Sequence, residues 1–441
     1  MNLENQNDDK TILRNKNTKK FYQTEKSKNR FGVSPKGVHL AIFELKILNE
    51  LAELKILNTN QLQFLHQKYQ SIKEDTLRKK LNRWHNREII HKIDVGKRKN
   101  FGNDMNLYRI DRNGIRILVQ EWFISENQHI DIKNFDNIKN IDHFLGTNQN
   151  ILGIKMELEV EGFTVEYANH LIKLTKDFGI ISDAILMIND VIIYIETDMG
   201  TESLAELNNK LYRYANLART YKNYKHIVAI SFLDNTYITR KYYEIKGDRR
   251  KANIKKLNIY NDDIFMPNLK ITLSDFNKTP NIITSTILNS SERNMLTHLN
   301  EFARLFQEKE KFILNQIDDT EVFSKQVLDT HRGLNVFCEV YNGAGNFVER
   351  IAMLIMDKND LHHNIIMNNL INYVSDNVFL KYINRLIVIY PTKEDREQDI
   401  YGISYLSNIL FTDLETMRED KEDRYYISKS AYNMKRVPYI I

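Results

Sequence analysis

The chain has 441 residues, of which 42% are hydrophobic, 27% charged and 10% aromatic. This composition is enough for packed cores and excludes a wholly disordered chain, and the length predicts about three domains of roughly 150 residues each. The single cysteine, Cys338, excludes an internal disulfide and a zinc site built from cysteines, which predicts a reducing, cytoplasmic setting. Apolar runs are too short to cross a bilayer and the polar start lacks a secretory pattern, so we expect no membrane contact.

Basic residues are concentrated towards the N-terminal end. Residues 1–122 contain 25 lysines and arginines against 14 aspartates and glutamates, whereas the rest of the chain contains 38 against 44. This asymmetry is typical of a module that binds a polyanion joined to a module with another task. Residues 1–36 are polar and lack hydrophobic periodicity, which predicts a disordered basic arm. A solvated tail with no binding role is the alternative.

Helical periodicity begins near residue 38, where apolar residues recur at steps of three and four. The predicted elements are a helix over 38–52, a short helix after Asn58 and Thr59, a helix from residue 74, extended runs over 89–95 and 105–110, and a helix over 112–121. On the third helix Leu77, Leu81 and Trp84 share one face, which we expect to be buried. The two extended runs form a hairpin with a basic tip at residues 96–102.

Three helices followed by a basic hairpin resemble a winged helix-turn-helix, whose third helix enters the major groove of DNA and whose wing touches the backbone. The pattern predicts such a domain over residues 37–122, bound to double-stranded DNA. The expected contacts lie on the outer face of the third helix and at the hairpin tip, namely Arg78, Lys79, Asn82, Arg83, Lys97, Arg98 and Lys99. Two alternatives stay open, because modules of this kind also bind proteins and charged runs are often only solvated.

A polar linker is predicted at residues 123–140 and a second domain at 141–284. The expected elements are a helix over 142–160, an extended run over 163–170, strands over 179–188 and 191–197, a helix over 204–221 and a strand over 226–233. The residues between the two central strands, Asn189 and Asp190, predict a two-residue hairpin turn. The order of elements is therefore αβββαβ.

Three acidic residues mark the end of this predicted hairpin. Glu196 and Asp198 project to the same side because side chains alternate along a strand, and Asp183 lies on the neighbouring strand. Carboxylates that share one point repel each other, so their convergence is most simply explained by a divalent cation such as Mg²⁺. The alternative is that these acids lie in solvent where the strands leave the core.

The spacing of Asp183, Glu196, Thr197 and Asp198 resembles the PD-(D/E)XK nuclease-like superfamily. With the preceding winged helix, the string ISDAILMI…YIETDMGTESLAELNNKLYRYA is similar to the plasmid replication-relaxation family. The resemblance implies a protein that acts on plasmid DNA in replication or mobilisation. Two positions depart from the superfamily pattern, because Ser182 replaces a proline and Asp198 replaces the expected lysine.

A substitute for that lysine is available on the following helix. Glu202, Glu206 and Lys210 are spaced by four and share one helix face, so Lys210 could approach Asp183 and complete a catalytic set of Asp183, Glu196, Asp198 and Lys210. The alternative is an ordinary ion pair between Glu206 and Lys210. Glu157 on the preceding helix is a further candidate ligand.

The remaining chain predicts a third domain over residues 285–441. Residues 237–257 mix basic residues with tyrosines, which suits nucleic-acid contact or, equally, a solvated helix. The expected elements of the third domain are helices over 292–307, 320–330, 347–356 and 365–374, and strands over 334–341, 385–390 and 409–414. Glu339, Asp413 and Glu415 do not predict a second carboxylate cluster, since no hairpin is expected between them. The predicted fold class of the whole chain is α/β, of the α+β kind.

The basic patterns predict binding to duplex DNA, and the resemblance implies a protein of plasmid replication or mobilisation. Nicking of a strand with Mg²⁺ by the nuclease-like domain is one of the open interpretations of its activity. Two alternatives stay open, namely a non-catalytic replication initiator or transcriptional regulator with a pseudo-nuclease scaffold, and a defence nuclease. The sequence predicts no particular oligomeric state.

Overall fold

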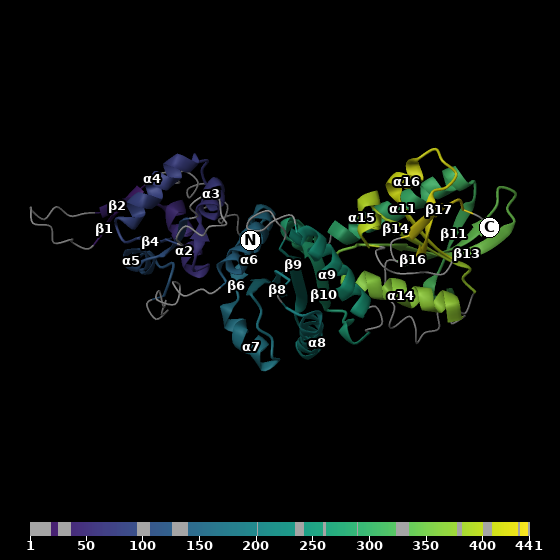
Figure 1. Cartoon of the computed structure of the whole chain (residues 1–441), viewed down its shortest axis with the longest axis horizontal. Helices are drawn as coiled ribbons and strands as arrows, with labels where there is room; N and C mark the ends of the chain where they lie inside the picture. The colour runs from purple at the N-terminus through teal and green to yellow at the C-terminus, as the bar shows by residue number, and fades with distance from the viewer. Residues whose placement is uncertain are drawn as a thin grey trace, which may run out of the picture. The chain divides into compact units, whose positions relative to one another are not determined.

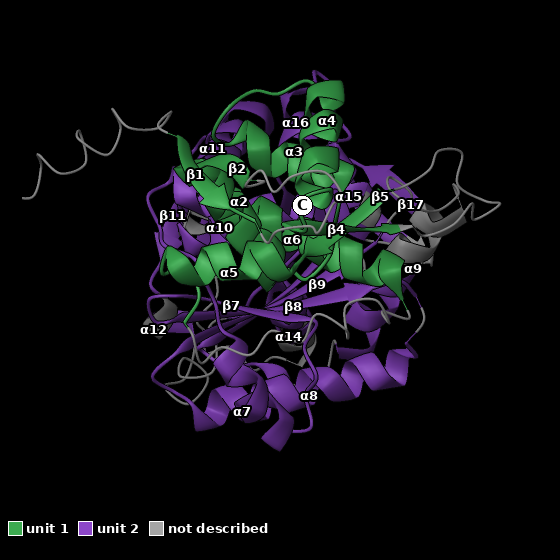
Figure 2. Ribbon diagram, turned by 90° about the vertical axis from the view of Figure 1, so that its left-hand side faces the viewer, with its two compact units in different colours: residues 1–156 green, residues 157–441 purple. Residues whose placement is uncertain are grey.

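The computed structural model describes residues 19–24, 37–94, 106–125, 140–200, 202–233, 242–258, 262–288, 290–322, 335–376, 382–399, 408–430 and 433–439. The chain divides into two compact units, residues 1–156 and 157–441 (Figure 2). Both contain helices and sheets, so the predicted mixed α/β class is confirmed. Among the described residues, no helix has the length and apolar character needed to span a membrane.

The first unit contains the predicted three helices and hairpin, except that residues 38–41, predicted as the start of the first helix, belong to a strand. Its elements are β1 (Lys19–Gln23), β2 (Gly37–Ala41), α2 (Ile42–Glu53), β3 (Leu57–Asn58), α3 (Thr59–Gln67), α4 (Glu74–His85), β4 (Ile90–Asp94), β5 (Asn106–Ile110), α5 (Arg112–Gln120) and most of α6 (Ile141–Val160). Strands β3, β5 and β4 form an antiparallel sheet in that order, and β1 pairs with β2. Strand β1 therefore lies within the span predicted as a disordered arm. The predicted linker is described only at its two ends.

Local sequence explains how α3, α4 and α6 are positioned. Asn58 caps α3 and forms a reciprocal capping box with Gln61, as the N-cap prediction required. The amide of Gln61 also donates to the Leu145 carbonyl of α6, and Asn148 of α6 donates to two carbonyls at the end of α2. The predicted apolar face of α4 is buried. Buried hydrogen bonds therefore hold α6 to the first unit, although its sequence pattern assigned it to the second domain.

The second unit contains two sheets. The elements of the first are β6 (Glu166–Tyr167), η2 (Asn169–Leu171), α7 (Ile172–Asp177), β7 (Ala184–Ile188), β8 (Val191–Asp198), α8 (Leu204–Thr220), β9 (Lys225–Phe232), α9 (Tyr242–Asn258), η3 (Asp262–Ile264), β10 (Leu269–Asp275), η4 (Phe276–Lys278) and α10 (Thr279–Ile287). Together with α6, they follow the predicted αβββαβ order except that a short helix, α7, lies between the first two strands. The strand order is β10-β9-β8-β7-β6. Strands β6, β7 and β8 are antiparallel, β8, β9 and β10 are parallel, and Ile188 pairs with Val191 across the predicted two-residue turn.

The second sheet has seven strands. Its elements are α11 (Ser290–Glu310), β11 (Ile313–Ile317), α12 (Asp319–Val322), β12 (Asn335–Tyr341), β13 (Phe347–Ile355), α14 (Leu361–Asp376), β14 (Arg385–Tyr390), α15 (Lys393–Asp399), β15 (Ile409–Asp413), α16 (Leu414–Arg418), β16 (Tyr425–Ser430) and β17 (Asn433–Val437). They run in the order β11 to β17 across the sheet. The prediction of a helix over residues 347–356 is wrong, because this segment is β13. A central strand is buried on both faces, so its apolar run lacks the alternation that marks a strand.

One long helix covers a face of each sheet (Figure 1). Apolar residues of α8 pack with β8, β9 and β10, and apolar residues of α14 pack with β13, β14 and β15. The sheets therefore supply rigid strand ends, and the helices behind them can present polar side chains at those ends.

Candidate active site

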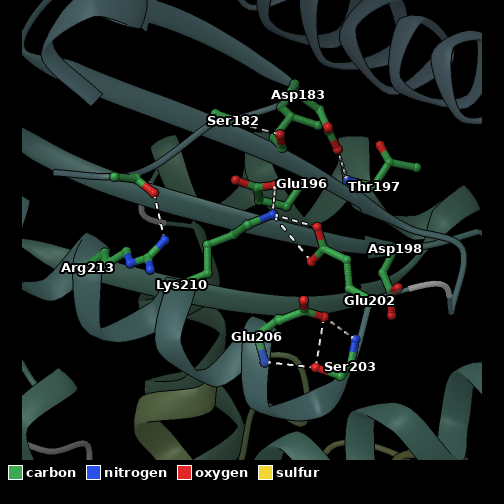
Figure 3. Close-up of polar contacts among 12 residues, drawn as sticks. Ser182, Asp183, Glu196, Thr197, Asp198, Glu202, Ser203, Glu206, Lys210 and Arg213 are labelled. Atoms are coloured by element: carbon green, nitrogen blue, oxygen red, sulfur yellow. Dashed lines mark hydrogen bonds and ion pairs between the residues drawn. The ribbon is translucent and has the colours of Figure 1, made fainter. Parts of the chain in front are cut away.

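The predicted acidic residues lie where β7 and β8 meet α8 (Figure 3). Asp183 precedes β7 and is exposed, and its carboxylate accepts the backbone N–H of Thr197 at 2.7 Å. Glu196 lies in β8 and is only 3% exposed. The hairpin register places Asp183 next to Glu196, because Ala184 pairs with Ile195. The structure therefore brings one exposed and one buried carboxylate together.

Two side chains of α8 bind the buried carboxylate. Lys210 Nζ lies 3.0 Å from Glu196 Oε2, and the Tyr214 hydroxyl donates to Glu196 Oε1. Lys210 and Tyr214 are four residues apart, so they project from one face of α8. The sequence analysis missed Tyr214, although its spacing from Lys210 was a usable signal. Lys210 also contacts Glu202 at 3.0 Å, while Glu206 serves as the capping-box partner of Ser203.

The electrostatics of this group follow from burial. Burial raises the pKa of the Glu196 carboxyl, and the negative charge of Asp183 raises it further, whereas Lys210 and Tyr214 act in the opposite direction. The pKa of Lys210 is raised by its carboxylate neighbours, Glu196 and Glu202, which outweigh burial. The ammonium group is therefore a fixed positive charge beside Glu196.

Asp198, the third predicted acid, makes a different contact. Arg250 of α9 binds both of its carboxylate oxygens, at 2.5 and 3.1 Å, and the N–H of Gly200 donates to it at 2.7 Å. Arg250 also donates to the carbonyl of Glu202. Asp198 and Arg250 thus anchor the loop before α8. No local spacing in the sequence indicated Arg250, because it lies more than fifty residues from Asp198 along the chain.

The three acids do not form one donor set for Mg²⁺, because Arg250 binds Asp198. Within the part of the chain that the structure describes, no three His, Cys, Asp or Glu side chains are grouped so that they could hold a metal ion. Asp183 and Glu196 are neighbours across the hairpin register, and Mg²⁺ is commonly held by one or two carboxylates with water and substrate phosphate. This pair fits the ion by the chemistry of its donors.

Other predicted residues of the second unit have separate contacts. The Glu157 carboxylate lies beside the Asn281 amide of α10. In α9, Lys251 pairs with Asp275 and Lys255 pairs with Asp399. These two lysines therefore hold α9 within the unit, so the structure does not offer them for nucleic-acid contact.

The first unit presents a basic surface on α4. Arg78, Lys79, Asn82 and Arg83 are all exposed, and a shallow hollow is lined by Lys79, Asn82, Arg83, Asn86 and Arg87. Arg78 differs from the others because it pairs with Glu74 at 2.6 Å. Lys97, Arg98 and Lys99 lie outside the described residues.

A comparison with family models gives a match that covers both the basic surface of α4 and the acidic group of the second unit. The model described as replication-relaxation matches residues 48–230, from α2 to β9. No curated protein matches the sequence. The matched segment contains α4, Asp183, Glu196 and Lys210.

Proposed function

We propose that this protein binds and nicks plasmid DNA, because the replication-relaxation family model matches residues 48–230 and supports the resemblance seen in the sequence. In this proposal the first unit is a winged helix-turn-helix that binds the duplex. The second unit is a PD-(D/E)XK-like domain whose centre is formed by Asp183, Glu196 and Lys210. The observation that carries the proposal is the 3.0 Å contact between Lys210 and Glu196, because it supplies the cation that Asp198 replaced.

DNA binding is supported by the geometry of α4. Leu77, Leu81 and Trp84 fix one face of the helix in the core, so Lys79, Asn82 and Arg83 remain on the opposite, exposed face. A helix of this kind fits the major groove, where lysine and arginine bind phosphates or guanine edges. Each phosphate that the surface neutralises releases counterions, so affinity should fall steeply as salt rises.

A pair of variants tests this interface. Lys79→Ala/Arg83→Ala should weaken binding to duplex DNA and lower the slope of log affinity against log salt by about 2, since one phosphate contact contributes about 0.9. The control is Lys173→Ala/Lys176→Ala, which removes two exposed lysines of α7. Fluorescence anisotropy with labelled duplexes at several salt concentrations provides the slope. Equal slopes for the two double variants would rule out α4 as the DNA-binding surface.

Strand cleavage is the second half of the proposal. Bound Mg²⁺ would polarise the phosphate and lower the pKa of a bound water. Asp183 and Glu196 would hold the ion, and Lys210 would offset the charge that develops on the phosphate. In the hydrolysis, the water oxygen bonds to phosphorus while one P–O ester bond breaks. The attacking water loses a proton and the leaving sugar oxygen gains one.

A non-catalytic initiator or regulator is the second candidate function. It is favoured by Asp198, because Arg250 binds both oxygens of the side chain at the superfamily lysine position. In that case Lys210 would serve only to neutralise Glu196. DNA binding that is insensitive to EDTA, together with intact strands on cognate DNA in Mg²⁺ and Mn²⁺, would support this candidate over cleavage.

A further inference from the structure

The second unit repeats one strand arrangement. In the first sheet, β6, β7 and β8 are successively antiparallel, and β8, β9 and β10 are successively parallel. In the second sheet, β11, β12 and β13 are successively antiparallel, and β13, β14 and β15 are successively parallel. The helix between the third and fourth strands is α8 in one sheet and α14 in the other. The next crossover contains α9 and α15, respectively.

The fifth strands end in the same way. Asp275 ends β10 and pairs with Lys251 of α9, and Asp413 ends β15 and pairs with Arg396 of α15 at 2.7 Å. In each sheet, the last residue of the fifth strand is therefore an aspartate bound by a cation from the preceding helix. These two aspartates give a common origin for counting positions across the sheets.

The residue two positions before each aspartate pairs with a residue on the neighbouring strand, which in turn pairs with one on the strand beyond it. These three residues form a row, and the two rows occupy equivalent positions in the two sheets. The row in the first sheet is Leu273, Ile230 and Glu196, and the row in the second sheet is Phe411, Val388 and Leu354. In the first row, Leu273 and Ile230 pack in the apolar cluster that contains α8, and the whole second row packs in the cluster that contains α14. The two rows thus face equivalent helices, and Leu354 stands at the position of Glu196.

The second sheet and α14 have apolar residues at the positions that correspond to Glu196, Asp198 and Lys210 in the first sheet and α8. Leu354 is fully buried, and Met356, which corresponds to Asp198, is fully buried beside it. Counted from the start of each helix, Met367 of α14 corresponds to Lys210 of α8, and it packs in the same apolar cluster. Asn335, which pairs with Leu354, stands at the position of Asp183. The second copy therefore lacks the pair of carboxylates and the cation of the first, and with them the groups that would hold Mg²⁺ and neutralise a phosphate.

We infer that β11 to β15 with α14 and α15 form a second, degenerate copy of the fold, so that of the two described sheets only the first carries a cleavage centre, and one chain cuts one strand of a bound duplex. This inference rests on the proposed function. It adds that the product of one chain acting on a closed circle is a nicked circle. Cleavage of both strands in one binding event needs a second centre, and the second copy does not supply one.

The test uses the full chain on supercoiled plasmid that carries its neighbouring DNA, with Mg²⁺ or Mn²⁺. Wild type and two variants are compared, namely Glu196→Gln and Leu354→Met. Leu354→Met keeps the side-chain volume of the second copy. Agarose gels separate supercoiled, nicked and linear circles over time, and circular dichroism reports folding.

We expect nearly all of the supercoiled plasmid to become nicked before linear DNA appears. Glu196→Gln should reduce nicking at least 100-fold, and Leu354→Met should leave the rate within about twofold, as a volume-conserving swap remote from the centre. Linear product that forms without a nicked intermediate would overturn the inference while leaving cleavage established. Loss of nicking in a folded Leu354→Met variant would also overturn it. Plasmid that is bound but stays intact in wild type would overturn the cleavage centre itself and this inference with it.

Discussion

Glu196 is a buried carboxylate, and its neighbours explain how the fold tolerates it. An ion of this kind removed from water costs several kcal/mol unless hydrogen bonds and an opposite charge replace the lost hydration. Lys210 and Tyr214 provide both, one at each carboxylate oxygen. Asp183 is exposed and can meet a phosphate or a metal ion directly. An exposed acid, Asp183, thus lies beside a buried one, Glu196, whose charge depends on two side chains of α8.

Substitution of Lys210 should make stability depend on pH. Lys210→Met removes the cation that lowers the pKa of Glu196, so the pKa rises further above its ordinary value of 4.5. A carboxyl whose pKa is higher in the folded state stabilises the fold at low pH and loses that contribution as pH rises. Urea unfolding should therefore show a loss of about 3 kcal/mol at pH 8 and a smaller loss at pH 5.

The matched control for this prediction is Lys210→Met/Glu196→Gln, in which no buried charge is left unpaired. It should recover most of the lost stability at pH 8, because a neutral amide can still accept from Tyr214. A Lys210→Met variant that loses the same stability at both pH values would show that Glu196 does not carry the effect.

Arg250 connects three elements, namely β8, the loop before α8, and α9. It binds Asp198 at the end of β8 and the Glu202 carbonyl before α8, while α9 holds its own backbone. Glu202 in turn contacts Lys210. The position of α8 relative to β8 therefore depends on α9, although α9 contributes no residue to the proposed centre.

Loss of Arg250 should be costly. Arg250→Gln leaves Asp198, whose side chain is 2% exposed, without its cation, and should lower the free energy of unfolding by about 3 kcal/mol. Arg250→Lys should restore only part of this, because an ammonium group cannot bind both oxygens in a planar fork. Arg304→Gln is the control, since its partner Glu308 is exposed and such surface pairs contribute less than about 1 kcal/mol. Equal losses for Arg250→Gln and Arg304→Gln would contradict the anchoring role of Arg250.

Local patterns predicted much of the fold, because caps and periodicity act over a few residues. The three helices of the first unit, the Asn189–Asp190 turn and the strands β8, β9 and β14 follow this rule. The prediction of a helix at β13 was wrong because a strand buried on both faces has no alternation of polar and apolar residues. In the candidate site, Lys210 could be foreseen from helix spacing. Arg250 could not, because its contact with Asp198 depends on how α9 folds back on the sheet.

At the scale of the whole molecule, the proposed tasks are divided between the two units. The basic surface of α4 belongs to residues 1–156, and the Asp183, Glu196 and Lys210 centre belongs to residues 157–441. The excess of basic residues lies in the first 122 residues and therefore within the first unit. Binding and cleavage should therefore be separable by substitution, with each unit changed on its own.

The most direct measurement is strand cleavage of cognate supercoiled plasmid by wild type, Asp183→Asn and Lys79→Ala/Arg83→Ala, in Mg²⁺ and in EDTA, with DNA affinity measured in parallel. We expect nicking that requires Mg²⁺ and is lost in Asp183→Asn, while DNA affinity stays within about threefold because α4 is unchanged. The α4 variant should lose affinity and regain nicking at high protein concentration. Nicking that persists in EDTA or in Asp183→Asn would contradict the account, as would intact plasmid at saturating wild type.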